Sequence, residues 1–156
     1  LCLVYVFSTR LAFNMRWWEI PERYPIQIWS SQESPEQFVD RILPVYSAFE
    51  YLDQQGRFKV LSVGNELRLY TDSEIYGVYF SKEANQALHT NTTSQGLARY
   101  LAERGYDYIL VYLPEQKHRP ELYLSPVLSE AFFSRYTRLE YQHKEVYLYQ
   151  LNRPDP

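Results

Sequence analysis

Three short apolar blocks in the middle of the chain predict its central strands. Residues 59–63, 74–80 and 108–113 are each rich in β-branched, aromatic or other apolar side chains, and polar segments separate them. Near-continuous apolar runs of this length are typical of strands that are covered on both faces. Gly64 follows the first block and Pro114 ends the third. We therefore predict three strands that share one core.

A helix is predicted between the second and third blocks. A polar segment over residues 81–89 leads to residues 90–94, which can supply a capping side chain. Leu97 and Leu101 then recur one helical turn apart, and Gly105 suits the left-handed position that follows many helices. The pattern indicates a compact crossover helix.

Another helical pattern precedes the strands. Ser34 as N-cap, Pro35 at the first helical position and Gln37 three residues after the cap resemble a capping box. Apolar residues then recur every three or four positions. Pro44 interrupts the pattern, where it removes an amide donor and clashes with the preceding turn. We expect a kink or a break between two shorter helices at this proline, and an end at Gly56.

The last third of the chain predicts one more helix and a pair of strands. Ser125 and Pro126 are predicted to begin a helix that runs to about Tyr136. Residues 137–144 and 145–151 both alternate between apolar and polar side chains, which fits a terminal antiparallel pair. Residues 65–70 are compatible with a short helix or an alternating strand, and we favour the helix.

Together these elements predict an α/β fold. Strands that alternate with helices favour a single-domain sandwich, with a mostly parallel sheet, helices on both of its faces and a C-terminal antiparallel strand pair. A chain of 156 residues is the size of one ordinary domain. We divide it into a connector over residues 1–33 and an α/β domain over residues 34–156.

The connector allows two interpretations. The apolar run over residues 1–7 is far shorter than the ~20 residues that span a bilayer. It is either an internal element of the domain or the last turns of a membrane helix. Arg10, Trp17 and Trp18 follow, and Arg with Trp is typical of a membrane-interface anchor. The two tryptophans fit core positions equally well, so both interpretations stay open.

Composition narrows the possible partners and chemistries. A net charge of -3 gives no overall basic field, so we expect no nucleic-acid partner. Cys2 is the single cysteine, which excludes an internal disulfide and a multi-cysteine metal site. The three histidines are scattered without metal-ligand spacing, and no nucleophile motif occurs. We therefore predict no catalytic residue, no metal and no cofactor.

The 16 tyrosines offer one further possibility. Tyrosine combines a large apolar ring with a polar tip, so half-buried positions beneath helices are the favoured interpretation. The alternative is a stacking platform for sugars. The tyrosines concerned are Tyr100, Tyr108, Tyr112, Tyr141, Tyr147 and Tyr149.

A ligand position is expected where the central strands end. Ligands of open parallel sheets bind beyond the carboxyl ends of the strands. Gly64, Asn65 and Glu66 follow the first strand, and Tyr112 ends the third. These residues together with Arg68 could hold a small polar ligand, although Glu66 and Arg68 also fit a surface ion pair. A lone glycine does not make a dinucleotide fingerprint.

Four features in a fixed order resemble a known family. They are the S-x-E-x-F helix start at residue 34, the K-V-L-S-V-G strand at residue 59, the helix leading to G-Y-D-Y-I-L-V at residue 105, and the V-Y-x-Y strand at residue 146. This order, over residues 34–151, resembles the carboxyl-terminal domain of polytopic membrane glycosyltransferases of the dolichyl-phosphate-mannose-protein mannosyltransferase type.

The resemblance implies a context. Such bacterial proteins place a soluble α/β domain on the extracytoplasmic (periplasmic) side of the inner membrane, after a bundle of membrane helices. Their catalytic and lipid-phosphate contacts lie among those helices, so the resemblance transfers no catalytic residue. It implies an accessory domain whose partners are membrane helices of the same polypeptide and a carbohydrate or protein acceptor. A stand-alone small-ligand-binding α/β module and a soluble enzyme remain as alternatives.

Overall fold

The computed structural model describes residues 34–65, 71–118 and 125–152. The chain groups into two compact units, residues 1–43 and 44–156. Helix α3 (Pro35–Ile42) belongs to the first unit, and all other described elements belong to the second. The predicted connector over residues 1–33, with its apolar run and its Arg and Trp residues, lies outside the described residues. So does most of the short helix predicted at 65–70. Both stay predictions, as does the domain boundary at residue 34.

The first helices follow the predicted capping and proline signals. Ser34 Oγ accepts a hydrogen bond from Gln37 N (3.2 Å), and Gln37 Oε1 accepts one from Ser34 N (2.9 Å), which confirms the capping box. The helical pattern breaks around Pro44, and α4 (Tyr46–Gln55) continues to Gly56. Gly56 has a φ of 140°, a value that favours glycine.

The second unit is built on a five-stranded sheet. Its strands are β1 (Lys59–Val63), β2 (Glu74–Gly77), β3 (Tyr108–Tyr112), β4 (Thr137–His143) and β5 (Val146–Leu151), in the order β2-β1-β3-β5-β4. β1 pairs in parallel with β2 and with β3, whereas β5 pairs antiparallel with β3 and with β4. The sheet is therefore mixed. The prediction of a mostly parallel sheet was wrong, because the C-terminal hairpin supplies β5 to the interior of the sheet.

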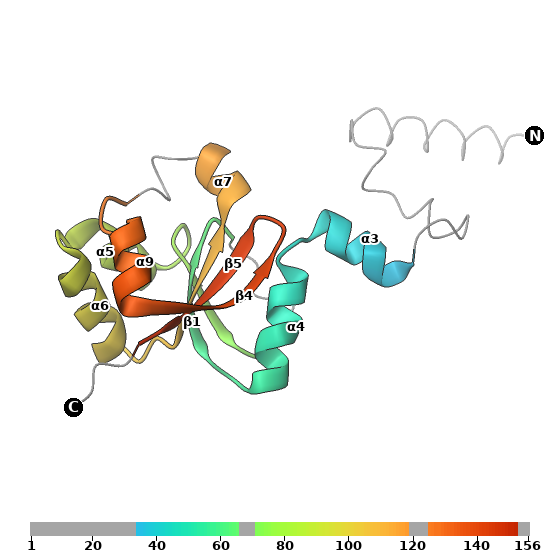
Figure 1. Cartoon of the computed structure of the whole chain (residues 1–156), viewed down its shortest axis with the longest axis horizontal. Coiled ribbons are helices and arrows are strands. Elements are labelled where there is room, and N and C mark those ends of the chain that lie inside the picture. The colour runs from blue at the N-terminus through green and yellow to red at the C-terminus, as the bar shows by residue number, and fades with distance from the viewer. Residues whose placement is uncertain (1–33, 66–70, 119–124, 153–156) are drawn as a thin grey trace, which may run out of the picture. The chain divides into compact units, whose positions relative to one another are not determined.

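Helices cover both faces of this sheet. Figure 1 shows α5 (Lys82–Thr90), α6 (Ser94–Glu103) and α9 (Glu130–Tyr136) together on one side, and α4 on the other. The side of α5, α6 and α9 holds a core cluster that includes the fully buried Leu61, Leu97, Leu101 and Ile109. Because strand side chains alternate, their neighbours Val60 and Leu110 point to the opposite face, where α4 contacts β4 and β5. The α/β class is thus confirmed.

Three local predictions were wrong. The second strand ends at Gly77 instead of residue 80, because Ser81 N donates to Gly77 O (2.9 Å) and closes a turn. The polar segment that follows forms α5, capped by Ser81, whose Oγ accepts from Ala84 N (3.2 Å). Pro114 does not end the third strand in a loop. It occupies the first turn of α7 (Leu113–His118), where the missing N–H is tolerated.

The start predicted for the last helix was also wrong. Ser129 caps α9 by accepting a hydrogen bond from Phe132 N (3.3 Å), and the helix begins at Glu130. The serine predicted to cap it, Ser125, instead donates through Oγ to Leu88 O (2.9 Å). This bond ties the segment before α9 to the end of α5. The predicted terminal strand pair is confirmed as β4 and β5.

Gly105 offers a test of the turn between α6 and β3. It has a φ of 73°, and a Cβ built on it would meet no atom within 4 Å. Gly105→Ala is therefore expected to lower the free energy of unfolding by about 1 kcal/mol, through backbone strain alone. Gly105→Asn should lower it less, because asparagine tolerates this conformation better. Urea denaturation measures both, and an Ala variant as stable as the parent would contradict the assigned conformation.

Candidate functional site

The structure brings three of the five predicted ligand-site residues to one edge of the sheet. Val63 of β1 pairs with Val111 of β3, so Gly64 and Tyr112 follow these residues at the carboxyl ends of neighbouring strands. Gly64 has a φ of 89°, and Asn65 comes next. Glu66 and Arg68 lie outside the described residues. We call the position of Gly64, Asn65 and Tyr112 the carboxyl edge.

Asn65 is the unusual residue of the carboxyl edge. Its backbone oxygen accepts a hydrogen bond from Ser62 Oγ (2.6 Å), which fixes the turn. Its side chain is only 8% exposed, and Nδ2 has no hydrogen-bond acceptor among the described residues. A buried amide without a partner costs about 1–3 kcal/mol, and such groups are commonly satisfied by water or by a ligand. Asn65 is therefore a candidate for a ligand contact.

An exposed aromatic pair lies near the same edge. Val78 N donates to Ser62 O (3.2 Å), which places the turn after β2 beside the end of β1. The next two side chains, Tyr79 and Phe80, are 54% and 69% exposed, and their ring centroids lie 4.8 Å apart. Sequence reasoning missed this pair because it assigned both residues to a strand. Two adjacent exposed rings are a candidate contact surface.

The opposite end of β1 carries an ion pair. Lys59 Nζ lies 2.9 Å from Glu83 Oε1 and donates to Arg104 O (3.1 Å). It also lies 4.6 Å from the ring centroid of Tyr76 and 4.4 Å from that of Tyr106. The hydrogen bond from Lys59 lowers the pKa of the Glu83 carboxyl. These contacts join β1 to α5 and to the end of α6, so the pair stabilises the fold.

Several tyrosine side chains of the second unit are buried or half-buried. Burial raises the pKa of the Tyr106 hydroxyl far above its ordinary value, and the negative charge of Glu83 adds to the effect. The hydroxyl makes no hydrogen bond of good geometry to a described residue, although Glu83 is near enough for its charge to act. Burial also raises the pKa of Tyr108 and Tyr149. Tyr149 packs on Phe133 of α9, with ring centroids 4.4 Å apart.

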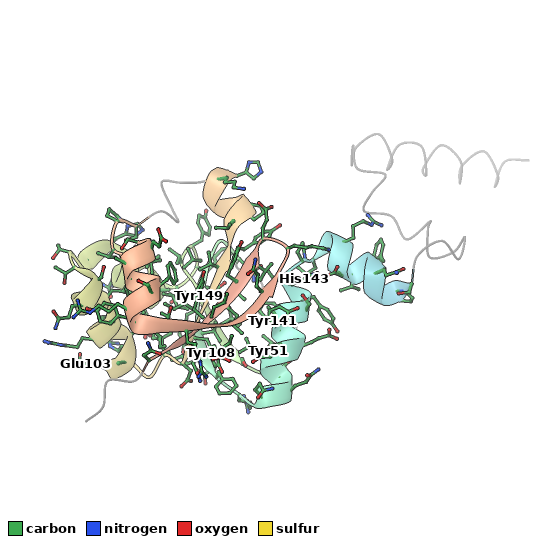
Figure 2. The ribbon with its side chains drawn as sticks, in the orientation of Figure 1. Tyr51, Glu103, Tyr108, Tyr141, His143 and Tyr149 are labelled. Carbon is green, nitrogen blue, oxygen red and sulfur yellow. The ribbon has the colours of Figure 1, made fainter. Side chains whose placement is uncertain are left out.

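The six tyrosines of the predicted sugar platform do not share one surface. Tyr147 and Tyr149 pack against the core on the side of α9, and Tyr100 packs there from α6. Tyr108 and Tyr141 belong to the other face of the sheet, where Figure 2 shows Tyr141 near Tyr51 of α4. Tyr108 is buried and the other five, Tyr112 included, are half-buried, which agrees with the favoured interpretation of half-buried rings.

A hollow opens where β1 and β3 begin. It has a volume of about 410 Å³. Phe58 precedes β1, Asp107 precedes β3, and the end of β5 and the start of β4 complete the wall. We call this the amino-edge hollow; its lining residues are Phe58, Asp107, Arg138, Gln150, Leu151 and Asn152. Sequence reasoning missed it because these residues come from four distant segments.

A groove between α6 and α9 adjoins this hollow. It has a volume of about 580 Å³, and Asn152 lines both cavities. Ala98 and Tyr136 contribute apolar surface, whereas Arg99 and Arg135 contribute positive charge. We call it the α6–α9 groove. Glu103, at the end of α6 in Figure 2, also lines it.

Within residues 34–65, 71–118 and 125–152, no three His, Cys, Asp or Glu side chains come together in a way that could hold a metal ion. None of the helices in these segments has the length and apolar character needed to span a bilayer.

Comparison of the chain with protein-family models, with curated proteins and with solved structures found no match. The resemblance to membrane mannosyltransferases therefore stays a prediction from the sequence.

Proposed function

We propose that this chain is a non-catalytic accessory domain of a membrane-embedded glycosyltransferase that uses a polyprenyl-phosphate-linked sugar donor. The domain would lie on the extracytoplasmic side of a bacterial inner membrane. Residues 34–156 would act as one α/β domain, with residues 1–33 as the connector to membrane helices of the same polypeptide. The four sequence features that carry the resemblance fall on the start of α3, on β1, on α6 with β3, and on β5. Each feature thus coincides with a regular element.

The observation that carries a recognition role is the chemistry of the carboxyl edge. Asn65 contributes a buried amide whose Nδ2 has no acceptor among the described residues, and Phe80 contributes an exposed ring close by. An apolar ring beside an amide group is suited to a carbohydrate or to a peptide, because both ligands combine apolar and hydrogen-bonding surface. This edge would therefore contact the acceptor or a protein partner.

The Lys59–Glu83 ion pair supports a recognition role for this chain in preference to a catalytic one. Lys59 is held by Glu83, by a backbone oxygen and by two rings. Its contacts join β1 to α5 and to the end of α6, and they lie at the end of β1 away from the carboxyl edge. The Lys59–Glu83 pair thus has a structural role.

A stand-alone small-ligand-binding module is the second candidate function. The Asn65 amide, which has no acceptor among the described residues and lies at the same edge as Gly64 and Tyr112, supports it as well. A thermal-shift screen of the chain with small polar compounds separates the two candidates. A compound at 100 times its dissociation constant should add about 2.7 kcal/mol of stability. Such a compound would favour the module, provided that the gene carries no upstream hydrophobic segments.

The accessory-domain proposal predicts a loss of sugar transfer when the exposed ring is removed. Phe80→Ala, in the complete reading frame and in native membranes, is expected to lower transfer from a polyprenyl-phosphate sugar about tenfold, equivalent to the loss of one aromatic contact. The isolated chain should show no turnover with the same donor. Radiolabelled sugar incorporated into acceptor measures both quantities.

The matched control is Leu139→Ala. Leu139 is another large exposed apolar residue, 47% exposed, but it lies on β4 away from the carboxyl edge. It should leave transfer unchanged. Equal transfer by the parent and Phe80→Ala would contradict the role of the aromatic pair. A reading frame that lacks upstream hydrophobic segments would contradict the membrane context.

A further inference from the structure

We propose that the amino-edge hollow and the α6–α9 groove together form a binding site for a neutral oligosaccharide. This inference is independent of the membrane context and concerns the edge of the sheet opposite to the carboxyl edge. The two cavities, of about 410 and 580 Å³, each fall within the usual range of small-ligand sites, roughly 300–1,000 Å³. Because Asn152 lines both, a ligand longer than one ring could occupy them together.

Polar side chains of the hollow hold one another in position. Arg138 Nε donates to Glu140, and an Arg138 terminal nitrogen donates to Gln150 Oε1 (3.1 Å). Gln150 Nε2 in turn donates to the Tyr108 hydroxyl (3.4 Å). This row of hydrogen bonds crosses β4, β5 and β3. Preorganised donors and acceptors of this kind lower the ordering cost of binding a polar ligand.

The backbone fixes two other lining residues. Asp107 Oδ2 accepts from Lys59 N (3.1 Å), and Asp107 N donates to Lys59 O (2.8 Å). Asn152 N donates to Tyr136 O (2.9 Å), which fixes the backbone of the exposed Asn152 where the two cavities meet. A carboxylate, a guanidinium and carboxamides can exchange hydrogen bonds with the hydroxyl groups of a sugar.

Aromatic surface completes the site. The Phe58 ring lies edge-on to Tyr108, with centroids 4.9 Å apart, and lines the hollow. Tyr136 lines the groove. Rings of this kind pack against the apolar face of a pyranose, while the polar groups around them contact its hydroxyls. One ring in each cavity matches a ligand with at least two sugar units.

Charge favours a neutral ligand over a phosphate or another strong anion. Arg99, Arg135 and Arg138 are positive, but Glu103 and Asp107 place negative charge in the same two cavities, and Glu140 pairs with Arg138. The carbonyl ends of α6 and α9 also lie here, because Glu103 and Tyr136 are their last residues. Helix C-termini disfavour anions. The net field therefore suits hydroxyl groups better than phosphate.

A titration of the isotope-labelled chain tests the inference. The probes are mannotriose, maltotriose, chitotriose and inorganic phosphate, followed by two-dimensional NMR of the backbone amides. At least one neutral trisaccharide is expected to shift the amides of Phe58, Arg138, Gln150 and Asn152, whereas phosphate should not. Asn152→Ala combined with Arg138→Ala is expected to weaken binding about tenfold, the value of one or two hydrogen bonds.

Gln142→Ala provides the matched control. Gln142 also carries an exposed carboxamide on β4, but it pairs with Tyr147 near the hairpin turn, away from the hollow. It should leave the affinity unchanged. Absence of shifts with every trisaccharide, or equal affinity in the double variant, would overturn the inference. Shifts confined to Asn65 and Phe80 would also overturn it, while supporting recognition at the carboxyl edge.

Discussion

Phe132→Ala is expected to lower the free energy of unfolding by about 3–5 kcal/mol, because it removes a fully buried ring from the core. Phe132 lies on α9 and packs against Phe133 and Tyr136, with ring centroids 5.5 and 5.6 Å away. The cavity left behind is lined by these rings and by sheet residues, which are held in place by strand pairing and can collapse only partly. Urea denaturation measures the change, on condition that the parent and the variant unfold with the same m-value.

Phe80→Ala is the matched comparison for this prediction. It removes the same side chain from a position that is 69% exposed, and it should change the free energy of unfolding by no more than about 0.5 kcal/mol. A stable Phe80→Ala variant would leave the exposed ring without a structural role, as recognition at the carboxyl edge requires. If both variants lost several kcal/mol, Phe80 would be a core residue and that recognition surface would lose its main support.

Local signals predicted the early part of the fold well. Strand β1 was predicted at 59–63 and lies there, since its apolar run is bounded by Gly64. The capping box at Ser34 and the break at Pro44 depend on contacts within a few residues, so the sequence alone determines them. Gly105 was placed correctly for the same reason, because a left-handed residue after a helix favours glycine.

Signals that depend on distant partners were missed. Helix α5 has a polar exterior, and two of its three buried residues, Ala84 and Ala87, are too small to produce a clear apolar stripe. The position of β5 between β3 and β4 follows from pairing across the sheet, which no short pattern encodes. The sequence therefore indicated an α/β fold but assigned too large a share of parallel pairs.

The two candidate sites also differ in whether local sequence signals predict them. Gly64 and Asn65 could be predicted as an edge position because they directly follow a strand, and the rule for parallel sheets names that edge. The amino-edge hollow could not be predicted. Phe58, Asp107 and Asn152 meet there only because the sheet brings the ends of three strands side by side. In the sequence, each of them looks like an ordinary surface residue.

Alkaline pH is expected to destabilise this protein partly through Tyr106. The folded-state pKa of its hydroxyl is raised, mainly by burial, whereas in the unfolded chain it is near 10. Its contribution to stability is therefore fully present below pH 10 and is lost as the pH rises towards the folded-state pKa. Between these values the unfolded state loses a proton that the folded state keeps, which removes about 1.4 kcal/mol for each pH unit.

Tyr106→Phe isolates this effect. The ring remains next to Lys59, and the lost hydroxyl makes no hydrogen bond of good geometry to a described residue, so stability at pH 7 should change by less than about 0.5 kcal/mol. Above pH 10 the variant should lose stability less steeply than the parent, and the two slopes should differ by about 1.4 kcal/mol for each pH unit. Urea denaturation at pH 7, 10 and 11 measures the difference. Parallel loss in both proteins would mean that the hydroxyl ionises as readily in the folded state as in the unfolded chain, which burial of Tyr106 does not permit.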